Sequence, residues 1–419
     1  MPADLIELDL TDAVYGGKAM GRYRGRPIFV PYAIPGERIT ARIVEDRRSY
    51  ANAEGVELLI ASPDRVRPEC PHFGPGRCGG CHLQHMNYPS QLRYKRAVVI
   101  DQLRRLGGVE RADRLVGDTI PSPEPWGYRA RATFHVAPDG RLGFVSTDPA
   151  RIEPIEWCYI LHPRAMALLE SLDLDTTGIQ QIEVRAGSDG RDMLILRTVD
   201  DAAPALEADT PVSVNLLLSD NEPVNLIGDS HTRYRVKGRD FRVTAGGFFQ
   251  VNLDIAGTLV DLVLERLDLH GGEAVLDLYA GVGLFSAFIA ERAALVAAVE
   301  SYPPAVTDAD ENLAAFDNVD LFEGGVEPVL WGLIEAGEGP FEAAVADPPR
   351  AGLDEDIPET LAELGVANLV YVSCDPATLA RDIKRLARRG YALQHVQPVD
   401  MFPQTYHIEC VAHFLRRPG

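Results

Sequence analysis

The sequence of 419 residues has little lysine, little tryptophan and no long apolar run. No apolar stretch approaches the roughly 18 residues that a membrane-spanning helix needs, so no membrane partner is expected. The first residues, Met1-Pro-Ala-Asp-Leu5, lack a basic segment followed by an apolar one, which argues against a secretory signal. We therefore expect a cytoplasmic protein whose cysteine thiols stay reduced.

The charge is strongly acidic overall but unevenly distributed. The net charge is −21, and lysine supplies only four of the 41 basic residues. Residues 1–100 carry 14 Lys and Arg against 11 Asp and Glu, whereas residues 271–419 carry 9 against 24. The acidic excess favours solubility and does not determine function. The mildly basic N-terminal part remains compatible with a nucleic-acid partner.

The length predicts two or three domains, and the sequence pattern changes twice. Residues 1–62 contain short alternating strands with Gly and Pro turns, which predict a small OB-like β-barrel. Residues 63–240 predict an α+β domain, with a helix near 88–106 and strands at 131–136 and 192–197. Residues 241–419 alternate helix and strand, as in a doubly wound parallel α/β sheet.

A cluster of basic and aromatic side chains lies between the first expected strands. Such clusters bind RNA in small barrels, although a solvated hairpin has the same composition. The cluster consists of Lys18, Arg22, Tyr23, Arg24 and Arg26.

Cys374 directly follows the apolar run 369–373, in the segment Tyr371-Val-Ser-Cys374-Asp-Pro-Ala-Thr378. This pattern predicts a thiol at the carboxyl edge of a sheet, where open α/β sheets bind ligands. Glu409 ends a second apolar, turn-rich stretch. A thiol and a carboxylate near a cofactor suit covalent chemistry on an electrophilic ring. A buried free cysteine is the alternative interpretation.

The segment 275–285 predicts a strand, a glycine turn and a helix start. Gly281 and Gly283 let the backbone approach a ligand at the helix N-terminus, while Ser286 replaces the third glycine of a dinucleotide fingerprint. Glu300 ends the next strand, about 20 residues on, where an acidic side chain holds ribose hydroxyls. The pattern resembles the S-adenosylmethionine (SAM) site of Rossmann-like methyltransferases.

Asp347 ends another expected strand and is followed by Pro348-Pro349-Arg350. Amino methyltransferases place an aromatic residue where Arg350 stands, so methylation of a base nitrogen is disfavoured. The Asp347 carboxylate can instead hydrogen-bond a base edge, or it can serve turn formation alone.

Four cysteines have the spacing of a metal or cluster site. Three lie close together and one follows far downstream, which is nearer to iron–sulfur spacing than to the two close pairs of structural zinc. Zinc or four unrelated thiols remain alternatives. The four are Cys70, Cys78, Cys81 and Cys158, and the sixth cysteine, Cys410, is expected to pack in an apolar run.

Together these segments resemble the RNA 5-methyluridine (uracil-C5) methyltransferases of the TrmA/RumA type over nearly the whole chain. The matching motifs are Cys70-Pro-His-Phe, Cys78-Gly-Gly-Cys81, Phe249-Gln250-Val-Asn252, the Cys374 segment and Met401-Phe-Pro-Gln-Thr-Tyr-His407-Ile-Glu409. The resemblance implies an RNA-binding TRAM barrel, a 4Fe–4S cluster on the four cysteines and SAM as cofactor. It implies SAM contacts by Gln250, Tyr279, Gly281, Glu300 and Asp347.

The resemblance also implies a mechanism. Cys374 would add to carbon 6 of uracil, Asp347 would orient the base, and Glu409 would remove the proton from carbon 5. Phe248 or Phe249, Arg129 and Arg131 are candidate RNA contacts. The substrate would be 23S rRNA or tRNA, with rRNA favoured, and the enzyme is expected to be a monomer.

Two other functions fit parts of the pattern. A cytosine-C5 RNA methyltransferase would normally carry a cysteine beside proline where Asp347 stands. A non-catalytic RNA-binding protein that senses iron or oxygen through a cluster would not need Cys374 and Glu409.

Overall fold

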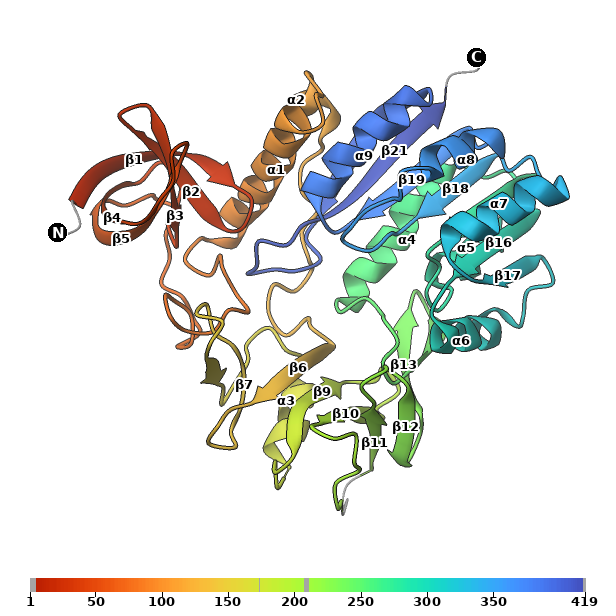
Figure 1. Ribbon diagram of the computed structural model, residues 1–419, viewed down its shortest axis with the longest axis horizontal. Coiled ribbons are helices and arrows are strands. Elements are labelled where there is room, and N and C mark those ends of the chain that lie inside the picture. Colours follow the sequence, from red (N-terminus) through yellow and green to blue (C-terminus); the bar gives the residue numbers. More distant parts are fainter. Residues whose placement is uncertain (1–4, 173, 207–210, 417–419) are drawn as a thin grey trace.

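The computed structural model describes residues 5–172, 174–206 and 211–416. These residues form three parts: a closed barrel, a middle sheet and a larger sheet covered by helices (Figure 1). In the described ranges, no helix combines the length and apolarity needed to cross a membrane.

The N-terminal part is a closed five-stranded barrel with strand order β1-β2-β3-β5-β4, as the sequence predicts. Its core forms because alternate residues of β1, such as Ile6, Leu8 and Leu10, point inward. At Gly21 a Cβ atom would lie 2.3 Å from the Asp9 carbonyl oxygen, so only glycine fits this strand crossing. The strands are β1 (Leu5–Val14), β2 (Lys18–Tyr23), β3 (Arg26–Pro31), β4 (Arg38–Asp46) and β5 (Ala51–Ile60).

The middle part is a seven-stranded sheet of order β12-β11-β10-β9-β6-β7-β8. Two strands expected from the sequence are β6 and β10, and the expected helix is α1, which packs against a C-terminal helix, α9. The helices α1 (Tyr88–Arg105) and α2 (Ala112–Leu115) precede this sheet in the chain and pack against the C-terminal part. The elements of the middle part are β6 (Arg131–Val136), β7 (Leu142–Val145), β8 (Ile152–Pro154), α3 (Pro163–Glu170), β9 (Ile179–Arg185), β10 (Asp192–Thr198), β11 (Val212–Leu217) and β12 (Pro223–Ile227).

A hairpin of β13 (His231–Val236) and β14 (Arg239–Thr244) joins the middle part to the C-terminal sheet. The C-terminal sheet has the order β17-β16-β15-β18-β19-β21-β20. Its strands are β15 (Ala274–Leu278), β16 (Leu295–Glu300), β17 (Val319–Glu323), β18 (Ala343–Ala346), β19 (Asn368–Ser373), β20 (Tyr391–Val399) and β21 (Glu409–Arg416). Its helices are α4 (Leu253–Leu267), α5 (Leu284–Ile289), α6 (Pro303–Leu313), α7 (Val326–Ala336), α8 (Ile357–Glu363) and α9 (Pro376–Arg388).

This sheet is parallel only in part, which corrects the expectation of a fully parallel sheet. Strands β15 to β19 run parallel, whereas β21 runs antiparallel to both β19 and β20. The loop 400–408 joins β20 and β21 directly, and a short connection of this kind cannot make a parallel crossover. Because β21 lies between β19 and β20, its second residue, Cys410, pairs with the last residue of β19, Ser373.

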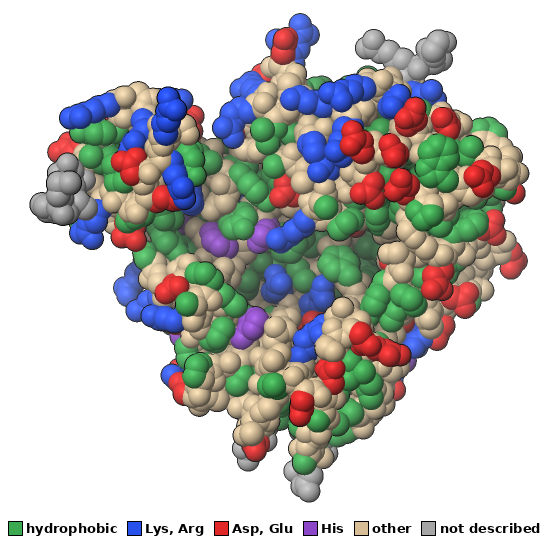
Figure 2. All heavy atoms as spheres, viewed as in Figure 1, with side chains coloured by type: hydrophobic (Ala, Val, Ile, Leu, Met, Phe, Trp, Pro, Cys, Tyr) green, Lys and Arg blue, Asp and Glu red, His purple; other side chains and the backbone are tan. Residues whose placement is uncertain are grey.

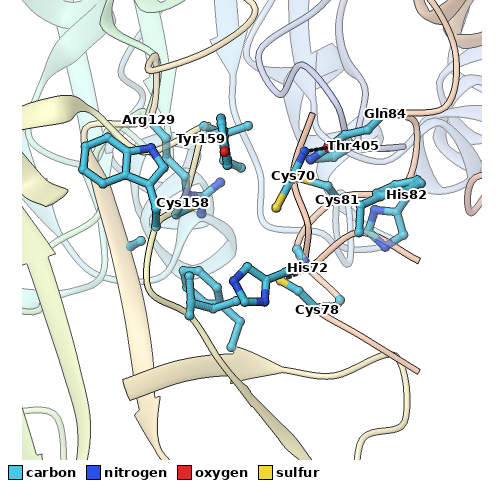
Figure 3. A pocket seen from close by; sticks show the side chains of 18 of the residues that line it. Cys70, His72, Cys78, Cys81, His82, Gln84, Arg129, Cys158, Tyr159 and Thr405 are labelled. Carbon is cyan, nitrogen blue, oxygen red and sulfur yellow. Dashed lines mark hydrogen bonds between the residues drawn. The ribbon is translucent and has the colours of Figure 1, made fainter. Parts of the chain in front are cut away.

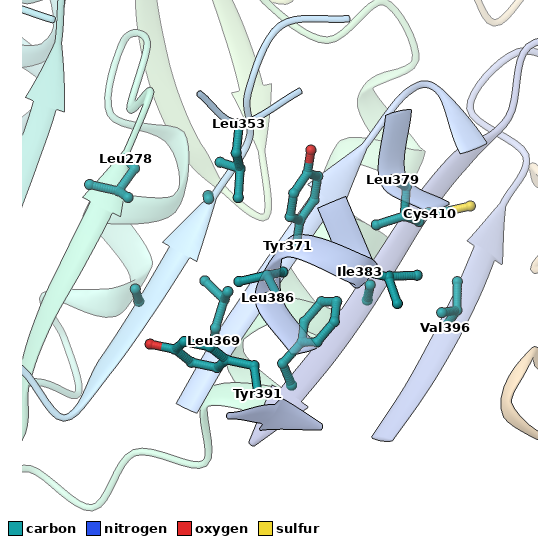
Figure 4. Close-up of a cluster of buried hydrophobic side chains, with 14 of the residues drawn as sticks. Leu278, Leu353, Leu369, Tyr371, Leu379, Ile383, Leu386, Tyr391, Val396 and Cys410 are labelled. Carbon is teal, nitrogen blue, oxygen red and sulfur yellow. The ribbon is translucent and has the colours of Figure 1, made fainter. Parts of the chain in front are cut away.

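The core beneath α9 is apolar and tightly filled. Leu379, Ile383 and Leu386 of α9 pack over Tyr371 and Cys410 of β19 and β21 (Figure 4). Cys410 is fully buried in this core, in agreement with its expected packing role. Burial of one such leucine stabilises the fold by about 2 kcal/mol, so this layer fixes α9 against the sheet.

Candidate active site

Cys374 lies between the end of β19 and the start of α9, half buried at the carboxyl edge of the parallel strands. Asp375 caps α9: its Oδ1 accepts hydrogen bonds from the N–H groups of Ala377 (2.8 Å) and Thr378 (3.0 Å). Pro376 occupies the first turn, where its missing N–H leaves no helix bond unmade. The cap therefore fixes the backbone next to the thiol.

Glu409 begins β21, and does not end the preceding stretch as expected from the sequence. Ser373 pairs with Cys410 in the antiparallel register, so Glu409 lies opposite Cys374. Glu409 is only 3% exposed. Burial raises its pKa well above the usual range, Asp347 raises it further, and Arg350 opposes the shift. A carboxylate with a raised pKa suits proton abstraction near neutral pH.

Two carboxyl groups lie near the carboxyl ends of neighbouring strands: Asp277, which is buried within β15, and Asp347, which is half-buried just after β18. Burial, with the charge of Asp277, raises the pKa of Asp347 to about 7. Burial also raises the pKa of Asp277 to about 7, although Ser286 opposes this by donating a hydrogen bond of 2.5 Å to Oδ2. Among the described residues, Oδ1 of Asp277 has no hydrogen-bond partner. Both carboxyl groups therefore ionise at a higher pH than an exposed aspartate does.

The expected cofactor turn follows β15. Gly281 and Gly283 adopt φ angles of +58° and +85°, and a Cβ at Gly283 would lie 2.9 Å from Cδ1 of Leu313. Tyr279 also has a positive φ, +63°, a strained backbone of the kind that clusters at functional sites. The Glu300 carboxylate accepts hydrogen bonds from the N–H groups of Gly281 (2.8 Å) and Tyr302 (2.8 Å). Glu300 is thus positioned directly against the turn.

Gln250 is buried in the segment between β14 and α4. The fully buried guanidinium of Arg185 holds this segment by donating to the carbonyl oxygens of Thr244 (3.1 Å) and Gly247 (2.9 Å). The Asp308 carboxylate accepts from the Thr244 N–H (2.6 Å) on the other side. Neither Arg185 nor Asp308 was identified from the sequence. Each makes its hydrogen bonds to residues of another element, and neither stands in a local sequence motif.

The loop 400–408 before Glu409 is fixed by α1. Lys95 donates to Asp400 (2.5 Å) in an ion pair with both side chains fully buried. The amides of Gln91 and Gln404 bond each other at 2.9 Å, and the N–H groups of His82 and Leu83 donate to the Gln404 carbonyl. Because His82 follows Cys81, the cysteine segment supports the loop that leads to Glu409. No sequence signal indicates these long-range bonds.

The four clustered cysteines line one cavity of about 310 Å³ (Figure 3). Cys70, Cys78 and Cys81 come from the segment after the barrel, and Cys158 comes from the segment between β8 and α3. Across residues 5–172, 174–206 and 211–416, no three His, Cys, Asp or Glu side chains are grouped to hold a metal ion. The thiols thus surround a space without converging on one point.

The centre of one molecular face is hollowed, and Lys, Arg and His side chains gather in it (Figure 2). Phe248 is 59% exposed, with the Arg131 guanidinium 5.2 Å from its ring centre. Phe249 is buried in the apolar core. Arg129 lines the cysteine cavity. Of the two phenylalanines considered as RNA contacts, only Phe248 is therefore accessible.

Comparisons with known proteins agree with this architecture. The family described as TRAM domain matches residues 5–56, and the family described as tRNA (Uracil-5-)-methyltransferase matches residues 333–417. An uncharacterized RNA methyltransferase of Streptomyces avermitilis is 38% identical over 97% of both chains. Another from Halalkalibacterium halodurans is 34% identical, over 98% of this chain and 96% of its own.

A solved structure matches the whole fold. It is the crystal structure of Pyrococcus abyssi tRNA (uracil-54, C5)-methyltransferase in complex with S-adenosyl-L-homocysteine. The TM-score is 0.74 with 27% identity, over 98% of this chain and 100% of that chain. The match thus includes the barrel, the middle sheet and the C-terminal sheet.

Proposed function

Since the chain belongs to the SAM-dependent RNA (uracil-5-)-methyltransferases, we propose that it methylates carbon 5 of a uridine through a covalent adduct with Cys374. The observation that supports this most directly is the convergence of Cys374, Glu409 and Asp347 at one sheet edge. That edge also carries the glycine turn and Glu300.

Carbon 5 of uracil is a weak nucleophile, and the proposed adduct overcomes this. The Cys374 thiolate adds to carbon 6, which places a negative charge on the C4–C5 enolate. Bound SAM supplies the electrophilic methyl group that carbon 5 takes up. Glu409 then removes the proton from carbon 5, and the C6–sulfur bond breaks to return the thiolate. The net reaction gives 5-methyluridine, S-adenosylhomocysteine and one proton.

The surroundings of Cys374 disfavour the thiolate in the free protein. Burial, with the negative charges of Glu409, Asp347 and Asp375, raises its pKa to about 12, and the positive charge of Arg350 opposes the shift. Both Glu409 and Asp347 have raised pKa values. Protonation of either one removes a negative charge that disfavours the Cys374 thiolate. We propose that Arg350 and the neutral form of Asp347 together permit thiolate formation when RNA is bound.

Asp347 is the proposed contact to the edge of the target base. The target must leave any stack to reach a half-buried thiol, as in other enzymes that modify bases. The exposed ring of Phe248 and the Arg129 and Arg131 guanidinium groups are proposed contacts to the RNA around it. The SAM contacts proposed are those of Gln250, Tyr279, Gly281, Glu300 and Asp347.

The activity is tested with SAM carrying a labelled methyl group and with transcripts of tRNA and of 23S rRNA. We expect label in 5-methyluridine when the transcript contains uracil, and mass-spectrometric mapping identifies the position. The sequence favours rRNA, whereas the P. abyssi protein is a tRNA (uracil-54, C5)-methyltransferase, so both are needed. Label in 5-methylcytidine would instead establish the cytosine enzyme, and no SAM binding by calorimetry would favour the non-catalytic alternative.

We propose that the cysteine cavity holds a 4Fe–4S cluster on Cys70, Cys78, Cys81 and Cys158. The donor set is four thiols from two chain segments, which is an iron–sulfur set. The Gly80 N–H donates to Sγ of Cys78 at 3.3 Å, a bond that stabilises a coordinated sulfur. Thiols around a cavity, and not around a point, favour a group larger than one ion.

Protein purified without oxygen is expected to be brown, with iron and acid-labile sulfide near four atoms each per chain for a 4Fe–4S group. Cys81→Ser should lower both contents strongly, because Cys81 is one of the proposed ligands. Cys410→Ser, which changes a core cysteine, should retain them. A colourless protein that contains zinc would contradict the cluster assignment.

A further inference from the structure

We infer that the Tyr15 hydroxyl of the barrel favours the thiolate of the nucleophile indirectly, because its hydrogen bond to Asp375 offsets negative charge beside Cys374. The inference rests on the proposed role of Cys374. It assigns a part in the reaction to a residue that lies 360 positions from the carboxylate it contacts.

The contact is direct. Tyr15 follows β1, and its hydroxyl donates to Oδ2 of Asp375 at 2.9 Å. The other oxygen, Oδ1, is already engaged by the cap of α9, through Ala377 and Thr378. The helix cap therefore holds the Asp375 carboxylate in place independently of the Tyr15 hydroxyl. Removal of the hydroxyl should change the charge environment without moving the helix.

The turn that carries Tyr15 is held in place on both sides. The Tyr94 hydroxyl of α1 lies within hydrogen-bond distance of the carbonyl oxygens of Val14 and Lys18, which flank Tyr15, and its one proton is shared between them. The Tyr15 ring packs edge-on against Tyr406, with ring centres 5.6 Å apart. Tyr406 lies in the loop before Glu409. The barrel thus contacts the segments of both the nucleophile and the base through one residue.

The physical effect follows from the charges around Cys374. Three carboxyl groups oppose the thiolate: Glu409 from β21, Asp347 after β18 and Asp375 at the start of α9. Arg350, also after β18, is the single favourable charge in this set. Donation from Tyr15 offsets part of the negative charge on Asp375. The hydroxyl remains protonated at neutral pH, because burial and Asp375 raise its pKa.

The matched substitution is Tyr15→Phe, which keeps the ring against Tyr406 and removes only the hydroxyl. The measurement is the rate of Cys374 alkylation by iodoacetamide against pH, in the full-length protein. Mass spectrometry of the Cys374 peptide separates it from the other cysteines. We expect about threefold to tenfold slower alkylation at a given alkaline pH, as less thiolate is present. Tyr50→Phe, which removes a barrel hydroxyl elsewhere, should leave the profile unchanged.

A double-mutant cycle identifies the route of the effect. Asp375→Asn preserves a capping side chain but removes the charge, so it should speed alkylation. In that background Tyr15→Phe should have little further effect. An unchanged profile in Tyr15→Phe, or an equal effect with and without the Asp375 charge, would overturn the inference.

The assay contains neither RNA nor SAM, so it is independent of the proposed function. If Tyr15→Phe shifts the alkylation profile but Cys374 proves dispensable for methylation, the electrostatic coupling stands and the catalytic role fails. If Cys374 is essential for methylation but its alkylation rate against pH is the same in Tyr15→Phe as in the wild type, only this inference fails.

Discussion

Cys374→Ala should lower RNA methylation by about 10⁴-fold or more, since loss of a covalent nucleophile commonly costs that much. Without the thiol, carbon 5 cannot be activated by addition at carbon 6. SAM binding should persist, because the glycine turn and Glu300 lie on other strands. Initial rates with labelled SAM, together with calorimetry of SAM binding, measure the two effects.

Cys410→Ala is the matched control for Cys374→Ala. It removes a thiol from the neighbouring strand, but Cys410 is fully buried in the core beneath α9. A modest loss of stability of about 1 kcal/mol is expected, with methylation retained. If Cys374→Ala kept a tenth or more of the wild-type rate, a covalent adduct through this residue would be untenable.

Glu409→Gln should trap a covalent complex between protein and RNA. The amide keeps the size of the carboxyl group but cannot take the carbon 5 proton, so the reaction stops after methyl transfer. Because Glu409 is buried and its pKa is raised, a neutral side chain suits its site and the fold should tolerate the change. Denaturing electrophoresis should show a slower band that carries both the labelled methyl group and RNA.

The double variant Cys374→Ala/Glu409→Gln provides the control for trapping. It should give no covalent band, because the bond that holds the RNA is missing. Turnover by Glu409→Gln at the wild-type rate would assign proton removal to another group. Asp347 would then be the first residue to test, since it lies close enough to influence the pKa of Glu409.

Local features of the fold were readable because short-range physical chemistry determines them. Alternating apolar and polar residues within segment 1–62 predicted short strands with one buried face, and two such runs, 6–10 and 38–44, lie in β1 and β4 of the barrel. The apolar run before Cys374 predicted a strand that places the thiol at its carboxyl end, and β19 ends directly before Cys374. The strand expected at the start of segment 275–285 is β15, and the strand expected to end at Glu300 is β16.

Long-range partnerships were not readable, because no local pattern depends on them. The antiparallel direction of β21 decides that Glu409 lies opposite Cys374, and it arises from the pairing of β20 with β21. The hydrogen bonds from the Arg185 guanidinium to the carbonyl oxygens of Thr244 and Gly247 join residues about 60 positions apart. Each of these contacts exists only after the separate parts have packed together.

By itself, the sequence determined which residues have the chemistry for the reaction: a thiol at a strand end, a carboxylate downstream and a glycine turn before an acidic strand end. Only the tertiary structure decided how they meet. The antiparallel strand brings Glu409 to the thiol, and the packing of the barrel brings Tyr15 to Asp375. The physical reason is that residue type and local spacing encode secondary structure, whereas burial and pairing across the chain set distances and charges.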